Sequence, residues 1–156
     1  LILFTPKSLL RHPKCISKLE DLSSGNFMEV IDDSKSQKKL VDKIVFTSGK
    51  LFYELDNKRD ELSSKNIAFV RIEQLYPFPN RNLEKVIDSY PNVSRFIWAQ
   101  EEPKNMGPWF HVNDKFRAVR PNIELISREE SASPASGSTK RYIERQKTII
   151  NKVFNL

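Results

Sequence analysis

Cysteine is nearly absent from this sequence of 156 residues, with Cys15 alone. A single cysteine excludes an internal disulfide framework and a zinc site built from several thiolates. Histidine is almost as scarce, since His12 and His111 are the two present. The sequence therefore predicts no metal site, and a reducing compartment: bacterial cytoplasm or mitochondrial matrix.

Long apolar runs are absent as well. The longest run, Leu1–Phe4, is far shorter than the roughly 20 residues that a membrane-spanning helix requires. No secretory signal pattern precedes it, so we expect no membrane partner. The sequence starts with this apolar run and without Met. We interpret this start as a cut from a longer polypeptide.

The charge is positive but not concentrated. The formal charge of +6 comes from 26 basic residues interleaved with 20 acidic ones. The densest basic stretches are Lys38–Lys39 with Lys43, and Lys140–Arg141 with Arg145, and both are typical of solvated helix or loop faces. With no recognition motif beside them, they do not indicate a nucleic-acid partner.

Short apolar segments alternate with amphipathic ones from residue 43 onward. Strands are predicted at Lys43–Thr47, Ile67–Ile72, Arg95–Gln100 and Ile123–Ser127. Helices are predicted at Lys50–Lys65, after an Asn80 cap, after Pro108, and at Thr139–Phe154. This alternation is typical of an α/β fold with three αβα layers around a mostly parallel sheet.

The first 30 residues do not follow this alternation. They predict a strand at Leu1–Phe4, a short helix at Ser17–Leu22 and an extra strand at Phe27–Ile31. We therefore divide the chain into residues 1–30, as the end of a preceding domain plus a linker, and a main domain at residues 31–156.

Polar segments follow each predicted strand, and in a parallel sheet they meet at the carboxyl edge, where ligands bind. Lys50 follows a Ser-Gly turn, Gln100 ends the third strand, and Arg128 follows the fourth. These three are our candidates for contacts with an anion or a regulator. For each of the three segments a structural explanation stays open: a tight turn, inter-domain hydrogen bonds, or a salt bridge with a nearby glutamate.

Sequence motifs typical of catalytic or nucleotide-binding sites are absent. The sequence has no Gly-x-Gly-x-x-Gly segment and no Gly-Asp-Gly segment, and its two histidines stand isolated. We therefore predict no catalytic, cofactor-binding or metal-ligating residue in this chain.

Five segments together resemble the C-terminal end of the decarboxylating subunit of 2-oxoglutarate dehydrogenase. They are Phe4–Pro13; Ser48–Lys50 with Tyr53; Val70–Pro77; Gln100–Pro103 with Asn105, Gly107 and Trp109; and Ser131–Pro134 with Gly137. The resemblance spans the chain in the family's order. It implies the third domain of a transketolase-like fold, with residues 1–5 as the last strand of the preceding pyrimidine-binding domain.

The resemblance also implies a function. The family oxidatively decarboxylates 2-oxoglutarate in the citric acid cycle, using thiamine diphosphate and magnesium held between the first two domains of a homodimer. The succinyl unit passes to a lipoyl group on the succinyltransferase component. The implied role of the third domain is structural and dimerising, so the chain alone should bind no cofactor and be inactive. The interface candidates are Gln74, Tyr76, Glu101, Glu102 and Trp109.

Some members of the family bind acetyl-coenzyme A as a regulator in this domain. Lys50 and Arg128 match that pocket, but Glu129 and Glu20 stand where those members have arginine. Reversed charges repel a polyphosphate, so the regulatory site is not expected here. Two alternatives stay open: a related thiamine enzyme (2-oxoadipate dehydrogenase or a carboligase), or a regulatory module that binds a nucleotide or acyl-coenzyme A.

Overall fold

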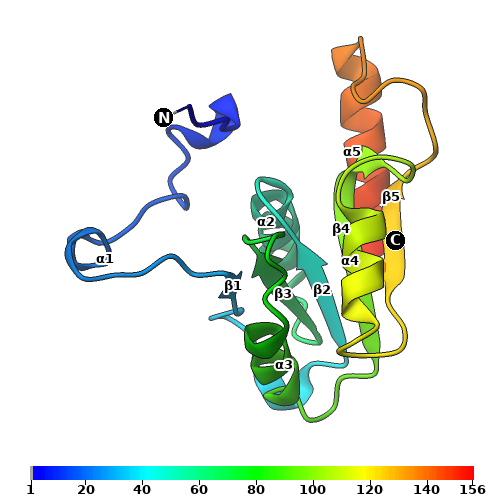
Figure 1. Ribbon diagram of the computed structural model, residues 1–156. Helices are drawn as coiled ribbons and strands as arrows, with labels where there is room; N and C mark the ends of the chain where they lie inside the picture. The colour runs from blue at the N-terminus through cyan, green and yellow to red at the C-terminus, as the bar shows by residue number, and fades with distance from the viewer. Residues whose placement is uncertain (1) are drawn as a thin grey trace.

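A computed structural model describes residues 2–156 and places them in a five-stranded sheet flanked by helices (Figure 1). The strands are β1 (Val30–Ile31), β2 (Lys43–Thr47), β3 (Ile67–Ile72), β4 (Arg95–Pro103) and β5 (Glu124–Arg128). The helices are α1 (Leu19–Ser23), α2 (Leu51–Leu62), α3 (Asn80–Asp88), α4 (Trp109–Phe116) and α5 (Thr139–Phe154), with 3-10 turns at Lys7–Leu9 and Lys38–Leu40. The predicted αβα fold is confirmed.

The sheet order is β1-β3-β2-β4-β5. β2 lies between β3 and β4 and runs parallel to both, and β5 continues the parallel set beyond β4. β1 pairs antiparallel with β3 at the other edge. The polar segments that follow β2 to β5 therefore meet at one edge of the sheet, as the sequence predicts.

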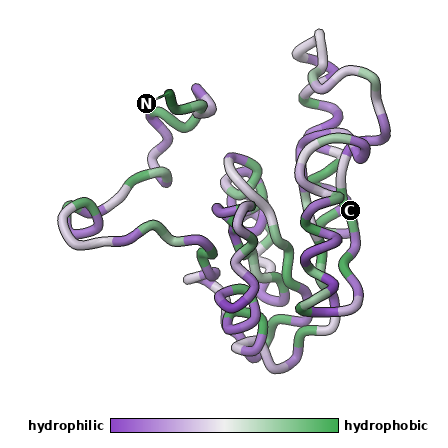
Figure 2. Tube along the Cα trace, viewed as in Figure 1, coloured by the Kyte–Doolittle hydropathy of each residue, from purple (hydrophilic) through white to green (hydrophobic). Residues whose placement is uncertain are grey.

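Each face of the sheet has its own core. On one face, Phe46 and Trp98 pack under α3 and α4, which contribute Leu83 and Phe116. On the other face, strand residues pack under α2 and α5; the buried members of this core are Val45, Leu51, Leu55, Ile67, Phe69, Ile97, Ala99, Ile149 and Val153. Burial on both faces explains why the strands are nearly continuous apolar runs, which Figure 2 shows as green tube in the centre of the molecule.

Two predicted helix ends need correction. α2 ends at Leu62 rather than Lys65, because Ser63 takes a left-handed backbone conformation and its amide closes the last turn on Arg59 and Asp60. Asn80 is not a cap: Pro79 holds that position, and the Asn80 side-chain oxygen is buried without a partner.

The N-terminal segment extends away from the sheet (Figure 1). The strand predicted at Leu1–Phe4 is not formed by residues 2–4, which have no neighbouring strand to pair with, and Leu1 lies outside the described residues. The strand predicted at Phe27–Ile31 is shorter in the structure, where β1 comprises Val30–Ile31. The short predicted helix is present as α1.

We expect Phe46→Ala to lower the free energy of unfolding by about 3–5 kcal/mol, because it opens a cavity in the centre of the first core. Phe46 is fully buried, and its ring centroid lies 5.3 Å from that of Phe116. Phe110→Ala is the matched control. Phe110 is 59% exposed, so its loss should cost less than about 1 kcal/mol in the same urea titration.

Candidate functional site

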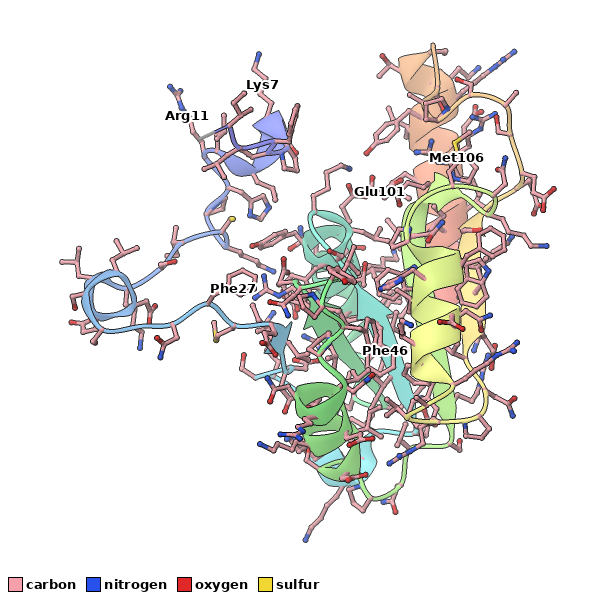
Figure 3. All side chains as sticks on the ribbon, viewed as in Figure 1. Lys7, Arg11, Phe27, Phe46, Glu101 and Met106 are labelled. Atoms are coloured by element: carbon pink, nitrogen blue, oxygen red, sulfur yellow. The ribbon has the colours of Figure 1, made fainter. Side chains whose placement is uncertain are left out.

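The carboxyl edge of the sheet carries the residues that the sequence analysis selected. Figure 3 shows Glu101 and Met106 at this end of the sheet, with Phe46 in its interior. β2 ends in a turn at Ser48 and Gly49, where Gly49 has φ +67°, a conformation that favours glycine. α2 starts directly after this turn, so Lys50 projects from the edge.

The Lys50 ammonium is hydrogen-bonded to other side chains of the chain. Its Nζ lies 2.5 Å from Glu101 Oε1 and 2.6 Å from the Tyr142 hydroxyl. Gln146 Nε2 donates to the same Glu101 oxygen at 2.9 Å. Burial opposes the charged form of Lys50, but the hydrogen bonds to Glu101 and Tyr142 outweigh it and raise its pKa. The ammonium is thus neutralised by Glu101, and the cluster joins α2, β4 and α5.

Both polar atoms of the Gln100 side chain are hydrogen-bonded within the chain. Its side chain is buried, its Oε1 accepts from Trp98 Nε1 at 2.9 Å, and its Nε2 donates to the carbonyls of Pro103 and Met106 at 3.1 and 2.8 Å. These bonds shape the loop after β4. The loop continues through Gly107, which has φ +67° and packs closely against Glu102.

The three predicted anion contacts divide between two cavities. Lys50 and Gln100 line one of about 270 Å³, together with Glu101, Glu102 and residues of the turn after β2. Arg128 lines a second cavity of about 250 Å³, between the end of β5 and α5. The structure therefore does not bring Lys50, Gln100 and Arg128 together around one ligand.

The interface candidates differ in exposure. Tyr76 is 83% exposed, and its ring centroid lies 6.5 Å from that of His111. Phe110, which precedes His111 in the chain, is 59% exposed. Behind them, the His111 ring hydrogen-bonds the Leu75 carbonyl at 2.9 Å, and Gln74 Nε2 donates to the Pro77 carbonyl at 2.7 Å. Trp109 is partly buried against the first core, and Glu101 belongs to the Lys50 cluster. Tyr76 thus has the exposure that an interface residue needs.

A buried ionic network on α2 was not predicted. Arg59 pairs with Asp33 and, at 2.6 Å, with Asp56, and all three side chains are at most 6% exposed. Asp33 also accepts the amide of Phe69 at 2.8 Å, which ties the segment before the sheet to β3. The signal in the sequence is the helical spacing of Asp56, Arg59 and Asp60, which puts these charges on one face.

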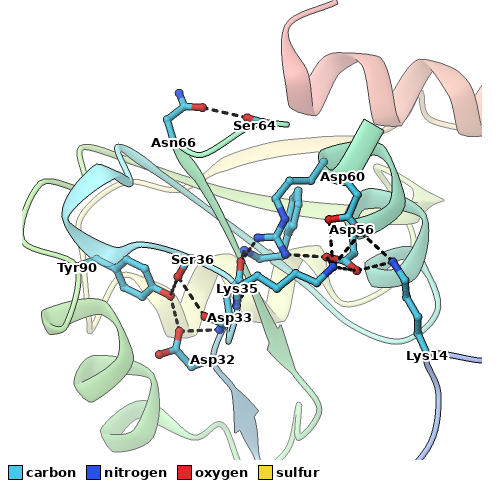
Figure 4. A network of polar contacts seen from close by, with 12 residues as sticks. Lys14, Asp32, Asp33, Lys35, Ser36, Asp56, Asp60, Ser64, Asn66 and Tyr90 are labelled. Carbon is cyan, nitrogen blue, oxygen red and sulfur yellow. Dashed lines mark hydrogen bonds and ion pairs between the residues drawn. The ribbon is translucent and has the colours of Figure 1, made fainter. Parts of the chain in front are cut away.

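Two lysines complete this network (Figure 4). Lys35 and Lys14 lie 2.8 and 3.0 Å from Asp56 Oδ2, and both also reach Asp60. Burial would raise the pKa of Asp56, but hydrogen bonds from Lys35, Lys14 and Arg59 outweigh it and lower the pKa to about 2. Lys14 thus connects the N-terminal segment to α2, and so does His12, whose ring centroid lies 4.8 Å from that of Tyr53.

Within residues 2–156, no group of three or more His, Cys, Asp or Glu side chains is placed to hold a metal ion. No helix in this part of the chain is long and apolar enough to cross a membrane.

Comparison with known proteins decides the family. Residues 16–154 match the family described as 2-oxoglutarate dehydrogenase C-terminal. The chain belongs to this family. It is 40% identical over 163 residues to the 2-oxoglutarate dehydrogenase E1 component of Azotobacter vinelandii, and 38% identical over 159 residues to that of Haemophilus influenzae. The oxoglutarate dehydrogenase of Buchnera aphidicola is 40% identical over 160 residues.

These matches cover 99–100% of this chain but 17–18% of each relative. The chain therefore spans about a sixth of the length of the relatives. Its similarity concerns the C-terminal domain and not the whole enzyme.

We expect Asp33→Ala to lower the free energy of unfolding by about 3–5 kcal/mol, because it leaves the buried Arg59 without its main partner and the Phe69 amide without an acceptor. Asp60→Ala is the control, since that side chain is 50% exposed. Its loss should cost about 1 kcal/mol or less. Urea denaturation of both variants measures this, and equal losses would contradict the importance of the buried pair.

Proposed function

We propose that this chain is the C-terminal domain of the decarboxylating subunit of a 2-oxoglutarate dehydrogenase, an oxidoreductase of the citric acid cycle. The supporting observation is the family match over residues 16–154, with relatives of that name aligned along the whole chain. The whole enzyme decarboxylates 2-oxoglutarate on thiamine diphosphate with magnesium and passes the succinyl unit to a lipoyl group of the succinyltransferase component.

The domain's role in that enzyme is structural. Its residues do not fit the cofactor: the sequence lacks a Gly-Asp-Gly segment, and residues 2–156 offer no carboxylate cluster for magnesium. At the carboxyl edge, Lys50 is hydrogen-bonded to Glu101 and Tyr142. Gln100 is hydrogen-bonded to the loop after β4. We therefore assign cofactor and substrate binding to other parts of the enzyme.

The N-terminal segment docks on the preceding domain of the same polypeptide. Nine of its large apolar side chains are 60–98% exposed: Ile2, Leu3, Phe4, Leu10, Ile16, Leu19, Leu22, Phe27 and Met28. Such a concentration of exposed apolar groups indicates a covered surface in the complete protein. Lys14 fastens this segment to α2, so docking fixes the orientation of the domain.

The second subunit of a homodimer covers the aromatic edge around Tyr76. Tyrosine and phenylalanine are enriched in the centres of protein interfaces. Tyr76 is exposed next to His111, and Phe110, one position before His111, is exposed as well. The bacterial origin of the relatives named above supports a bacterial cytoplasm rather than a mitochondrial matrix.

The purified chain should neither bind thiamine diphosphate in a calorimetric titration with magnesium nor release carbon dioxide from 2-oxoglutarate. The reason is that the sequence lacks a Gly-Asp-Gly segment, and that Lys50 and Gln100 at the carboxyl edge are hydrogen-bonded within the fold. Circular dichroism confirms that the protein tested is folded. Saturable cofactor binding, or carbon dioxide release above a heat-denatured control, would overturn the structural role.

A further inference from the structure

Residues 2–28, here called the strap, lie outside the sheet and contact α2 (Figure 1, Figure 4). Among the ion pairs of the described residues, those that join the strap to the rest of the chain come from Lys14, which lies 3.0 Å from Asp56 and 3.1 Å from Asp60. Beside them, the ring of His12 lies against that of Tyr53. Nine large apolar side chains of the strap are 60–98% exposed, so burial of apolar surface contributes little to its attachment.

The carboxylates that hold Lys14 have a second ammonium partner. Lys35 Nζ donates to both oxygens of Asp56, at 3.0 and 2.8 Å, and to both oxygens of Asp60, at 3.1 and 2.9 Å. Asp56 also accepts from Arg59 at 2.6 Å. If Lys14 leaves, each carboxylate therefore keeps a cation, and its loss does not strand a buried charge, which is what makes the loss of a buried pair costly.

The Lys14 ion pairs are accessible to solvent. The side chain of Lys14 is 38% exposed and that of Asp60 is 50% exposed. Exposed ion pairs are weak and are screened by salt, with a screening length of about 10 Å at 0.1 M and about 3 Å at 1 M. The attachment of the strap should therefore weaken as ionic strength rises.

The rest of the domain does not need the strap for its packing. The buried residues of both cores begin at Val41. Just after the strap, the carbonyl of Glu29 accepts the amides of Glu73 and Gln74 at 2.9 and 3.1 Å. The chain is thus fixed to the sheet from Glu29 onward, and a segment held by few contacts can open locally while the core stays folded.

We propose that the strap is a salt-sensitive conformational device: it detaches from α2 when the Lys14 ion pairs are screened, and Lys35 then holds Asp56 and Asp60 alone. Pro6 of the strap lines the cavity of about 270 Å³ at Lys50, so detachment removes one wall of that cavity. The attachment does not depend on the function proposed above. In that enzyme the strap leads to the preceding domain, so its detachment frees the orientation of this one.

The test is limited trypsin digestion of the 156-residue chain, with the first cuts identified by mass spectrometry. Trypsin takes the lysine side chain into its specificity pocket, so cleavage after Lys14 requires that Lys14 leave Asp56 and Asp60. Lys18 is the internal control, because it is exposed in the same strap and has no ion pair among residues 2–156. The rate after Lys14 relative to Lys18 should rise about two- to fivefold between ~0.1 M and ~1 M salt.

Asp60→Asn should raise the same ratio by about two- to fivefold at ~0.1 M salt, because it removes one of the two carboxylates. Glu61→Gln is the matched control, with the same change in charge on the same helix. Glu61 pairs with Lys58 at 2.9 Å, so its loss should change the ratio less than about 1.5-fold. Cleavage after Lys43, which is 4% exposed, reports unfolding of the domain and should stay negligible throughout.

A ratio that is the same at both salt concentrations and in Asp60→Asn would overturn the proposal, because the strap would then be held by something other than these ion pairs. An equal effect of Glu61→Gln would reduce the result to general charge attraction and also overturn it. So would cleavage after Lys43 that keeps pace with cleavage after Lys14, because detachment would then require unfolding of the whole domain.

Discussion

The fold depends on a parallel sheet whose two faces are both buried. β2 lies at its centre, between β3 and β4, and side chains alternate from it into two separate cores. Two neighbouring parallel strands must be joined by a crossover connection, which is usually a helix. Each such helix packs on one face of the sheet. This constraint brings the loops after β2, β3, β4 and β5 to one edge, so every candidate binding residue lies there.

Charged groups inside the domain connect its helices and strands to one another. Glu101 joins α2, β4 and α5 through Lys50, Tyr142 and Gln146. Lys43, which is 4% exposed, donates to the Val153 carbonyl at 2.7 Å near the end of α5, although burial lowers its pKa. These hydrogen bonds from charged groups connect the helices to the sheet. Arg128 is the contrast, because its buried Nε has no hydrogen-bond partner among residues 2–156.

The order of strands and helices could be predicted from the sequence, because apolar periodicity and proline positions report local structure directly. α5 matches its predicted bounds of Thr139–Phe154. Long-range pairing could not be predicted in this way. Lys50 was selected for its turn, but its distance of 2.5 Å from Glu101 depends on strand order. Likewise, Asp33 and Arg59 are 26 positions apart, and no local pattern predicts that pair.

A domain exchange tests the central claim most directly. In the Azotobacter vinelandii relative, the C-terminal region that aligns with this chain would be replaced by this chain, and 2-oxoglutarate decarboxylation measured. The account predicts a dimeric chimera with decarboxylation well above that of the same protein truncated before the domain. A folded chimera that stays monomeric and as inactive as the truncated protein would contradict it.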